Sequence, residues 1–328
     1  MHPQKKVFVT RRIPEKGLDI LRKECALEVW PGGLPPTTDE LLASVAGIDG
    51  ILSLLTDKID AAVMNAAGPE LKVISNYAVG YDNIDIAEAT RRGIAVGNTP
   101  GVLTEATADH TFALLMAAAR RVAEGDRQVR AGKWHTWEPL GLLGADIYGA
   151  TLGLVGFGRI GQAVAKRAMG FEMRVLFHDP NYQGTGHEQT GAMAADLELL
   201  LKESDFVSVH VPLTDQTQKL FNQETFNKMK QGAILINTAR GGVVDHSALY
   251  DALKNGHLAA AGLDVTEPEP LPMDSPLLTL ENLILTPHIA SASRRTRERM
   301  AVMAAENLLA GIKGDRLPNC VNPKIYSH

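Results

Sequence analysis

The chain has 328 residues, enough for about two domains, and its hydrophobic content of 45% and charged content of 22% are ordinary for a globular protein. A net charge of −5 argues against a general nucleic-acid binder, and the most apolar run, 111–119, is far shorter than the ~20 residues of a membrane span. Cys25 and Cys320 lack CxxC spacing and no signal-peptide pattern opens the chain, so we expect a cytoplasmic protein without a disulfide framework or a metal site.

Short apolar strands alternate with amphipathic helices through the first hundred residues. This alternation is typical of a parallel sheet with crossover helices. The predicted strands are 7–10, 27–30, 50–55, 71–75 and 94–96, and the predicted helices lie near 15–24, 38–46, 59–66 and 84–92.

A long helix is predicted next, over 104–121, with Thr104 near its start and many alanines that allow close helix contact. A second alternating series follows it and predicts a second α/β domain. A further long helix is expected over 293–313, and no internal repeat is visible. The strands of the second series are predicted near 152–156, 174–178, 206–211, 233–237, 260–265 and 283–286.

The first strand of the second series runs into the glycine pattern Gly156-Phe-Gly158-Arg-Ile-Gly161, which precedes a predicted helix. In a dinucleotide-binding turn, Gly156 permits the tight turn, Gly158 lets a pyrophosphate approach bare backbone, and Gly161 lets helix and strand pack closely. The helix N-terminus near Arg159 offers free N–H groups to the phosphates. An isolated GxGxxG is also found in ordinary glycine-rich turns, so the context decides.

Asp179 supplies that context, because it ends the next predicted strand 18 residues after Gly161. A carboxylate there accepts hydrogen bonds from the ribose hydroxyls and repels a 2′-phosphate, which favours NAD over NADP. The alternative is a simple turn at Asp179-Pro180. A nicotinamide cofactor would restrict the chemistry to hydride transfer or to sensing of the cofactor.

Three polar residues follow later strands of this series: Arg240, Glu269 and His288. Open parallel sheets bind ligands beyond the carboxyl ends of their strands. Reduction of a 2-oxo acid needs a forked cation for the carboxylate, a proton donor for the carbonyl oxygen and a carboxylate that orients the donor. We therefore predict that Arg240 binds the carboxylate and that His288 is the proton donor, oriented by Glu269.

Each of these residues also has a structural alternative. Arg240 is placed to cap a helix or to pair with Asp245, Glu269 to be a solvated loop residue, and His288 to be a hydrogen-bonded structural histidine. Asp264 suits a contact with the nicotinamide amide or the capping of a turn. In the first domain, the glycine in Asn76-Tyr-Ala-Val79-Gly80-Tyr-Asp82 permits a small anion nest of backbone N–H groups or an ordinary β-turn.

The glycine pattern lies in the middle of the chain, which predicts an inserted cofactor domain. We expect an α/β protein of two doubly wound parallel-sheet domains, with a Rossmann cofactor domain inserted into a flavodoxin-like substrate domain. The inserted domain would span 101–289, and the outer segments, 1–100 and 290–328, would form the substrate domain together.

With these residues assembled, the chain resembles the D-isomer-specific 2-hydroxyacid dehydrogenases over essentially its full length, and within them the glyoxylate/hydroxypyruvate reductases. The stretches 76–85, 103–110, 155–162, 236–241 and 286–289 carry the resemblance. It implies that Arg240, Glu269 and His288 are the catalytic residues, and that the backbone of Val79 and Gly80 holds the substrate carboxylate. The cofactor contacts it implies are Thr104, Gly156, Phe157, Gly158, Arg159, Ile160, Gly161, Asp179, Pro212, Thr217, Thr238, Asp264 and His288.

The resemblance also implies a homodimer formed through the cofactor domains, in which Trp137 reaches the substrate site of the partner subunit. Asp179 departs from several glyoxylate reductases that carry arginine or another non-acidic residue there, and it supports NAD. Glu269 disfavours a formate dehydrogenase, where glutamine would be expected. Other substrates on the same fold, such as 2-ketogluconate or phosphite, and an NADH-sensing co-repressor without turnover are the alternatives.

Overall fold

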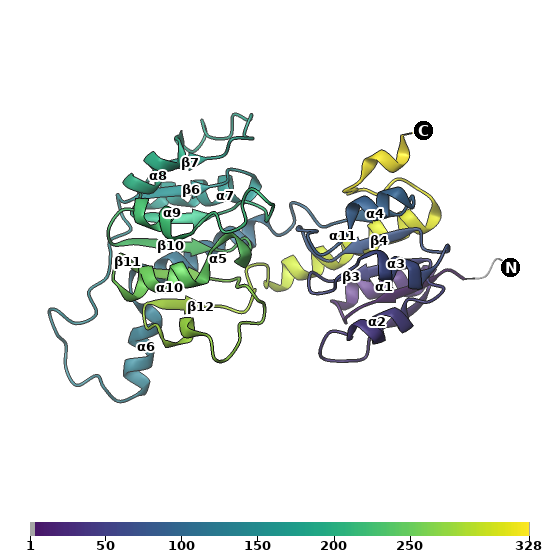
Figure 1. The fold of residues 1–328 in the computed structure, drawn as a ribbon, viewed down its shortest axis with the longest axis horizontal. Helices are drawn as coiled ribbons and strands as arrows, with labels where there is room; N and C mark the ends of the chain where they lie inside the picture. The colour runs from purple at the N-terminus through teal and green to yellow at the C-terminus, as the bar shows by residue number, and fades with distance from the viewer. Residues whose placement is uncertain (1–3, 328) are drawn as a thin grey trace. The chain divides into compact units, whose positions relative to one another are not determined.

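The protein is described by a computed structural model covering residues 4–327. The chain divides into two compact units, one made of Met1–Leu103 with Ala292–His328, and the other of Thr104–Ser291. Figure 1 shows the fold, with the elements coloured along the chain. Both units contain one sheet in which every paired strand is parallel.

Unit 1 has a five-stranded sheet with the order β2-β1-β3-β4-β5, which is the flavodoxin-like order. The helices α2, α3 and α4 pack on one face of this sheet through a buried cluster that includes Phe8, Ile51 and Ile74. The elements from the first segment of the chain are β1 (Lys6–Val9), α1 (Glu15–Glu24), β2 (Ala26–Val29), α2 (Thr38–Ser44), β3 (Gly50–Ser53), α3 (Ala61–Ala67), β4 (Val73–Asn76), α4 (Ile86–Arg91) and β5 (Ala95–Gly97).

The C-terminal segment returns to unit 1 and adds α11 (Arg294–Lys313) and the 3₁₀ turn η4 (Pro323–Tyr326). Ser293 caps α11 by accepting from the Thr296 N–H at 3.3 Å. The helix lies close on the sheet: a Cβ added at Gly311 would meet Val73 Cβ at 2.5 Å, and one at Gly17 of α1 would meet the Ala301 carbonyl oxygen at 2.6 Å. Unit 1 is thus completed by residues from the far end of the chain.

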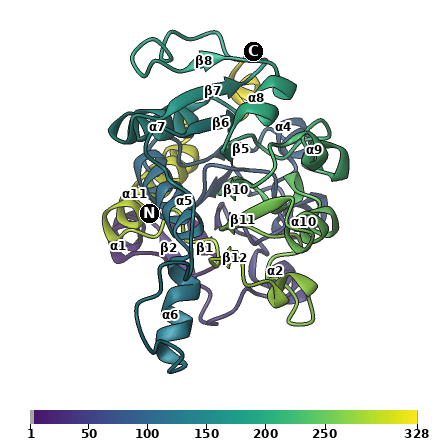
Figure 2. The ribbon, with the colours of Figure 1, turned by 90° about the vertical axis from the view of Figure 1, so that its left-hand side faces the viewer.

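Unit 2 has a seven-stranded sheet with the order β12-β11-β10-β9-β6-β7-β8. Counted from its own first strand this is the Rossmann order 3-2-1-4-5-6 with one more strand, so the predicted fold class is confirmed for both units. Figure 2 shows α5 and α7 on one side of this sheet and α8, α9 and α10 on the other. The strands are β6 (Thr151–Val155), β7 (Arg174–His178), β8 (Met193–Ala194), β9 (Phe206–Val209), β10 (Ala233–Asn237), β11 (Leu258–Leu263) and β12 (Leu283–Leu285).

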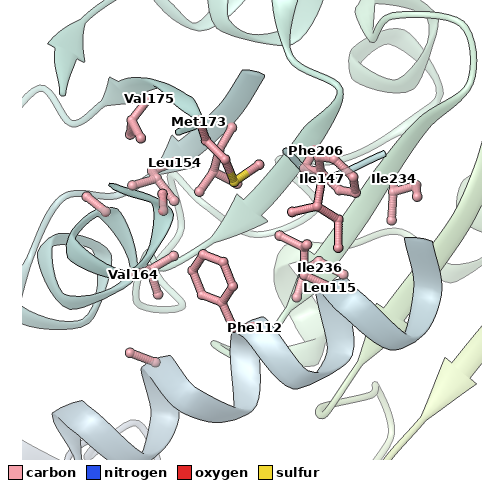
Figure 3. Close-up of a cluster of buried hydrophobic side chains, with 14 of the residues drawn as sticks. Phe112, Leu115, Ile147, Leu154, Val164, Met173, Val175, Phe206, Ile234 and Ile236 are labelled. Atoms are coloured by element: carbon pink, nitrogen blue, oxygen red, sulfur yellow. The ribbon is translucent and has the colours of Figure 1, made fainter. Parts of the chain in front are cut away.

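The strands of unit 2 are apolar on both faces because both faces are covered by helices. On one face Phe112 and Leu115 of α5 pack against Leu154 and Ile236 of the sheet (Figure 3). On the other face α8, α9 and α10 cover alternate residues such as Val155. The helices and 3₁₀ turns are α5 (Thr104–Ala119), α6 (Val122–Arg130), α7 (Arg159–Ala168), η1 (Met169–Phe171), α8 (Leu197–Glu203), α9 (Gln223–Lys228), η2 (Gly241–Val243), α10 (His246–Lys254) and η3 (Pro276–Thr279).

The predicted single helix over 104–121 is wrong at its end. The helix α5 stops at Ala119, and Arg121 takes a left-handed conformation with φ 52° before α6 begins. The Arg121 side chain is held by Glu124 at 2.8 Å, which stabilises this reversal. Figures 1 and 2 both show α6 and the segment after it extending beyond the sheet of unit 2.

Candidate functional site

The imidazole of His288 and the carboxylate of Glu269 form a hydrogen-bonded pair. His288 Nδ1 lies 3.0 Å from Glu269 Oε2, and the two side chains are 23% and 35% exposed. The other ring nitrogen, Nε2, has no hydrogen-bond partner within residues 4–327. A carboxylate on Nδ1 fixes the ring orientation and leaves Nε2 as the nitrogen that can give a proton to a ligand or take one from it.

The backbone of His288 is held in a left-handed conformation, with φ 54°. This conformation costs a non-glycine residue roughly 1–2 kcal/mol. Asp264, which follows β11, supplies the compensation: its carbonyl oxygen accepts from the His288 N–H at 2.8 Å, and its carboxylate accepts from the N–H groups of Ile289 and Ala290, each at 2.8 Å. The turn that presents the imidazole is therefore tied to the neighbouring strand end.

Asp264 is buried and has two further partners. Thr286 Oγ1 donates to its Oδ1 at 2.6 Å, and His110 Nε2 of α5 lies 3.2 Å from the same oxygen. Burial would raise the pKa of Asp264, but the hydrogen bonds from His110, Thr286 and the Ile289 and Ala290 N–H groups outweigh it and hold the pKa below its usual value. The group is thus a carboxylate at neutral pH that holds the N–H groups of the turn after His288.

Arg240 lies beyond β10, the strand next to β11, on a turn shaped by Asn237. The Asn237 amide donates to the Arg240 carbonyl at 2.9 Å and its oxygen accepts from the Ala239 N–H at 3.0 Å. A Cβ added at Gly241 would lie 2.0 Å from the Thr266 carbonyl, so this segment packs directly on the loop that carries Glu269. Asp245 instead caps α10 and pairs with Lys219 at 3.1 Å.

The sheet order explains why these residues gather at one edge of unit 2. The strands β10, β11 and β12 are neighbours and all parallel, so Arg240, Glu269 and His288 follow the same ends of three adjacent strands. The structure joins Glu269 directly to His288 and brings the Arg240 turn against the Glu269 loop. This arrangement gives one edge a cation, an imidazole and a carboxylate.

The glycine pattern has the geometry of a dinucleotide-binding turn. Gly156 has φ 96° and a Cβ there would meet the His210 main chain at 2.7 Å, while a Cβ at Gly161 would meet the Gly156 carbonyl oxygen at 2.4 Å. A Cβ at Gly158 would meet no atom within 4 Å, so the backbone there faces open space. Gly158 is followed by α7, whose first N–H groups lack acceptors in the helix and are suited to bind phosphate. The turn lies between β6 and β9, where the strand order of the sheet reverses.

Asp179 is fixed against this turn. Its Oδ2 accepts from the Phe157 N–H at 2.8 Å and its Oδ1 accepts from the Asn181 N–H at 3.0 Å. The Phe157 ring is fully buried and stacks on Phe177 with ring centroids 4.1 Å apart. The buried ring and the bond from its N–H thus fix Phe157 in the turn, and the Asp179 carboxylate is oriented before any ligand binds.

The other predicted cofactor contacts lie in unit 2 as follows. Thr104 begins α5, and Thr238 is buried with its hydroxyl 2.9 Å from that of Thr111. Thr217 donates to the Pro212 carbonyl at 2.6 Å and so fixes the turn after β9. Arg159 and Ile160 form the first residues of α7.

Three predicted substrate-binding residues do not follow β10, β11 or β12 in the chain: Trp137, Val79 and Gly80. Trp137 is exposed within the segment 131–146, which contains no helix or strand. Val79 and Gly80 belong to unit 1, on the loop that follows β4. The sequence assigns no role to Asn76, Asn98 and His110. Asn76 and Asn98 donate to the Gly80 and Val79 carbonyls of the loop after β4, and His110 lies 3.1 Å from the Thr286 hydroxyl.

Comparison with known proteins identifies the family. Residues 112–290 match the family model described as D-isomer specific 2-hydroxyacid dehydrogenase, NAD binding domain. The chain belongs to the D-isomer specific 2-hydroxyacid dehydrogenase family. It is 56% identical over 321 residues to a glyoxylate reductase of Korarchaeum cryptofilum, covering 98% of this chain and 96% of the relative. A glyoxylate reductase of Thermococcus litoralis is 51% identical over 326 residues, covering 98% of both chains.

Solved structures of other proteins superpose on this chain over nearly its full length. A protein from Thermus thermophilus superposes with a TM-score of 0.90 at 54% identity, covering 96% of this chain and 99% of that one. An NADPH-dependent glyoxylate/hydroxypyruvate reductase from Sinorhizobium meliloti gives 0.83 at 32% identity, covering 98% and 99%. A D-lactate dehydrogenase from Aquifex aeolicus, solved with NAD and lactic acid, gives 0.84 at 30% identity, covering 97% and 99%. This chain is thus an NAD-binding dehydrogenase.

Two further observations bear on other ligands. No helix within residues 4–327 is long and apolar enough to cross a membrane. The same residues contain no cluster of three or more His, Cys, Asp or Glu side chains placed to hold a metal ion.

Proposed function

We propose that this enzyme uses NADH to reduce glyoxylate, hydroxypyruvate or a similar short 2-oxo acid to the D-2-hydroxy acid. The observation that carries the proposal is the His288–Glu269 pair, with Nε2 left free on the imidazole. The glyoxylate reductases that are about half identical to this chain support the substrate class. We propose the roles predicted from the sequence for Arg240, Glu269 and His288.

Each of these residues has one task. NADH supplies the hydride for the carbonyl carbon. Arg240 binds the substrate carboxylate through its forked guanidinium, together with the main chain of Val79 and Gly80. His288 gives a proton to the carbonyl oxygen as charge builds there, and Glu269 stabilises the protonated ring. In the reverse direction the neutral imidazole takes the hydroxyl proton.

The residues present fit a dinucleotide. The bare backbone at Gly158 and the start of α7 suit a pyrophosphate, and the pre-oriented Asp179 suits an adenosine ribose with a free 2′-hydroxyl. Asp179 would repel the 2′-phosphate of NADPH, so we propose a preference for NADH. We assign Thr104, Pro212, Thr217, Thr238 and Asp264 to the same binding surface.

Steady-state kinetics tests the proposal directly. Glyoxylate, hydroxypyruvate, pyruvate and phosphite should be compared, the first three with NADH and NADPH and phosphite with the oxidised cofactors. We expect the highest kcat/KM for glyoxylate or hydroxypyruvate with NADH. Turnover of phosphite alone would reassign the substrate, and tight NADH binding without any turnover would favour a cofactor-sensing protein. A preference for NADPH would refute the role given to Asp179.

We further propose a homodimer formed by unit 2. The helix α6 and the segment after it expose large apolar side chains, including Val129, Trp134, Trp137 and Leu140. Beside α6 lies a cavity of about 520 Å³ bordered by α5, β11 and β12, and its lining includes Ala117, Ala118 and Ala260. Large exposed apolar patches are typical of protein interfaces. We assign it to a second copy of this chain, with Trp137 of the partner subunit reaching the substrate site.

Light scattering of the wild type and of Val129→Glu tests the dimer. We expect twice the monomer mass for the wild type and a shift toward monomer for the variant. A monomeric wild type at micromolar concentration would rule this assembly out.

Since Cys25 and Cys320 are both free thiols, we place the enzyme in a reducing compartment, the cytoplasm.

A further inference from the structure

The loop after β4 has three consecutive carbonyl groups that are each held by a donor inside unit 1. The Ala78 carbonyl accepts from the Thr99 N–H at 2.8 Å. The Val79 carbonyl accepts from Asn98 Nδ2 at 2.8 Å, and the Gly80 carbonyl accepts from Asn76 Nδ2 at 2.9 Å. Two of the three donors are asparagine side chains from the ends of different strands.

A hydrogen bond that fixes a carbonyl group also fixes the direction of the N–H group in the same peptide unit. A trans peptide unit is planar, so the N–H of the next residue points opposite to the carbonyl. The three anchored carbonyls therefore turn the N–H groups of Val79, Gly80 and Tyr81 away from the groups that hold the loop. None of these three N–H groups donates a hydrogen bond within residues 4–327. Successive free N–H groups of this kind form an anion-binding nest.

The asparagine that holds Gly80 is itself fixed. Asn76 is fully buried at the end of β4, and its oxygen accepts from Ser53 Oγ at 3.0 Å. Its amide also lies 3.0 Å from the oxygen of Asn83, whose own amide donates to the Leu54 and Asp57 carbonyls at 3.0 and 2.9 Å. The nest is thus positioned by a network reaching the ends of β3 and β4.

We propose that Asn98 and Asn76 are positioning residues for the substrate carboxylate. Asn98 sets the direction of the Gly80 N–H and Asn76 sets that of the Tyr81 N–H, so that the loop receives an anion without rearrangement. The inference rests on the proposed function, because it identifies what prepares the carboxylate-binding main chain. Preorganised donors bind more tightly because less ordering is lost on binding.

Asn98 is the better residue to test, because Asn76 lies in the core network and its loss endangers folding. In Asn98→Ala we expect KM for glyoxylate to rise about tenfold, the value of one hydrogen bond of roughly 1.4 kcal/mol. The kcat at saturating glyoxylate, the Kd for NADH and the melting temperature should stay close to wild type. Asn98→Asp keeps the side-chain size but removes the donor, and should raise KM at least as much.

Asn322→Ala is the matched control. Asn322 is a buried asparagine of the same unit that accepts from the Val96 N–H and donates to the Ile94 carbonyl, each at 2.9 Å. These partners belong to the start of β5 and not to the loop after β4. Its loss should lower the melting temperature and leave KM unchanged. An unchanged KM in both Asn98 variants, or equal KM changes in Asn98→Ala and Asn322→Ala, would overturn the inference.

Failure of the proposed function is seen separately, as a wild type without turnover on any 2-oxo acid. In that case calorimetric titration of the NADH-loaded protein with oxalate, a planar two-carbon dicarboxylate, decides the inference. Weaker oxalate binding by Asn98→Ala than by wild type and Asn322→Ala supports it. Equal binding by all three, or no binding to the wild type, refutes it.

Discussion

The two sheets of this chain both carry their functional loops beyond the carboxyl ends of their strands, but the groups they present differ. Unit 2 presents charged and titratable side chains, with Arg240, Glu269 and His288 following three adjacent strands. In the loop after β4, unit 1 presents main-chain N–H groups whose direction is set by Asn76 and Asn98. Side chains suit proton transfer and main chain suits binding, so a change in unit 2 should lower kcat and a change in unit 1 should raise KM.

Replacing His288 should have the largest effect and should fall on kcat. We expect His288→Asn to lower kcat by about 10²–10⁴, the usual contribution of a positioned general acid. Asparagine is chosen because it tolerates the left-handed backbone at this position better than most residues. Stopped-flow and steady-state NADH consumption measure the loss, and an unchanged melting temperature is the control. Wild-type turnover in this variant would reject the assigned role.

Arg240→Lys should have the second-largest effect. It is an exception to the division between kcat and KM, because Arg240 is a binding residue that belongs to unit 2. Lysine keeps the charge but loses the planar fork, so we expect kcat/KM for glyoxylate to fall about 10- to 100-fold. Kinetics at fixed saturating NADH gives this value. If lysine supports wild-type kcat/KM, two-point binding of the carboxylate by Arg240 is wrong.

Asp179 provides a change in unit 2 that should leave the chemistry intact. Asp179→Ala removes the carboxylate that would accept from the ribose hydroxyls, so the Kd for NADH should rise about tenfold, the loss expected for a hydrogen bond to a charged group. The ratio of the Kd for NADPH to the Kd for NADH should therefore fall. Fluorescence titration with both cofactors measures the ratio. A ratio that does not move would show that the 2′-position lies elsewhere.

Asp264→Asn should have the smallest effect on rate and a measurable effect on stability. Asparagine loses one of the acceptors for the Ile289 and Ala290 N–H groups, so unfolding free energy should drop by about 1–3 kcal/mol at neutral pH. Because the pKa of Asp264 is lowered in the folded protein, its contribution is present above the usual value of 3.8 and is lost as the pH falls through the lower folded-state pKa.

Urea denaturation of both proteins at neutral pH and at acidic pH checks this prediction. The difference between wild type and Asp264→Asn should shrink as the solution is acidified. Asp196→Asn is the control, since Asp196 is an exposed cap of α8 and asparagine caps a helix equally well. A difference that grows on acidification would contradict the direction of the pKa shift.

Much of this arrangement is readable from the sequence because parallel strands are local apolar runs. The predicted bounds of 15–24, 174–178 and 233–237 coincide with α1, β7 and β10. The glycine pattern and Asp179 have fixed spacing, so their meeting at Phe157 follows from one βαβ unit. The sequence names Arg240, Glu269 and His288 because each follows a strand of one parallel sheet.

The rest depends on contacts between distant residues, which a local pattern does not encode. His110 meets Asp264 only because α5 packs beneath the sheet, and Asn98 meets Val79 only because β4 and β5 are neighbours. Three short helices between residues 180 and 260 are not predicted from the sequence: α8, α9 and α10, of seven, six and nine residues. The end of α5 is missed because Arg121 and Glu124 reverse the chain without a glycine or proline.

The discontinuity of unit 1 has a consequence for synthesis on the ribosome. Unit 2 is one continuous stretch, whereas the sheet of unit 1 lacks α11 until the chain beyond Arg294 has emerged. Domains tend to fold as they are completed. We therefore expect the later-made unit to become protease-resistant first, in nascent chains arrested with residues up to 291 exposed. Until translation ends, the face of the unit 1 sheet that α11 later covers would be exposed, and it would depend on chaperones for protection.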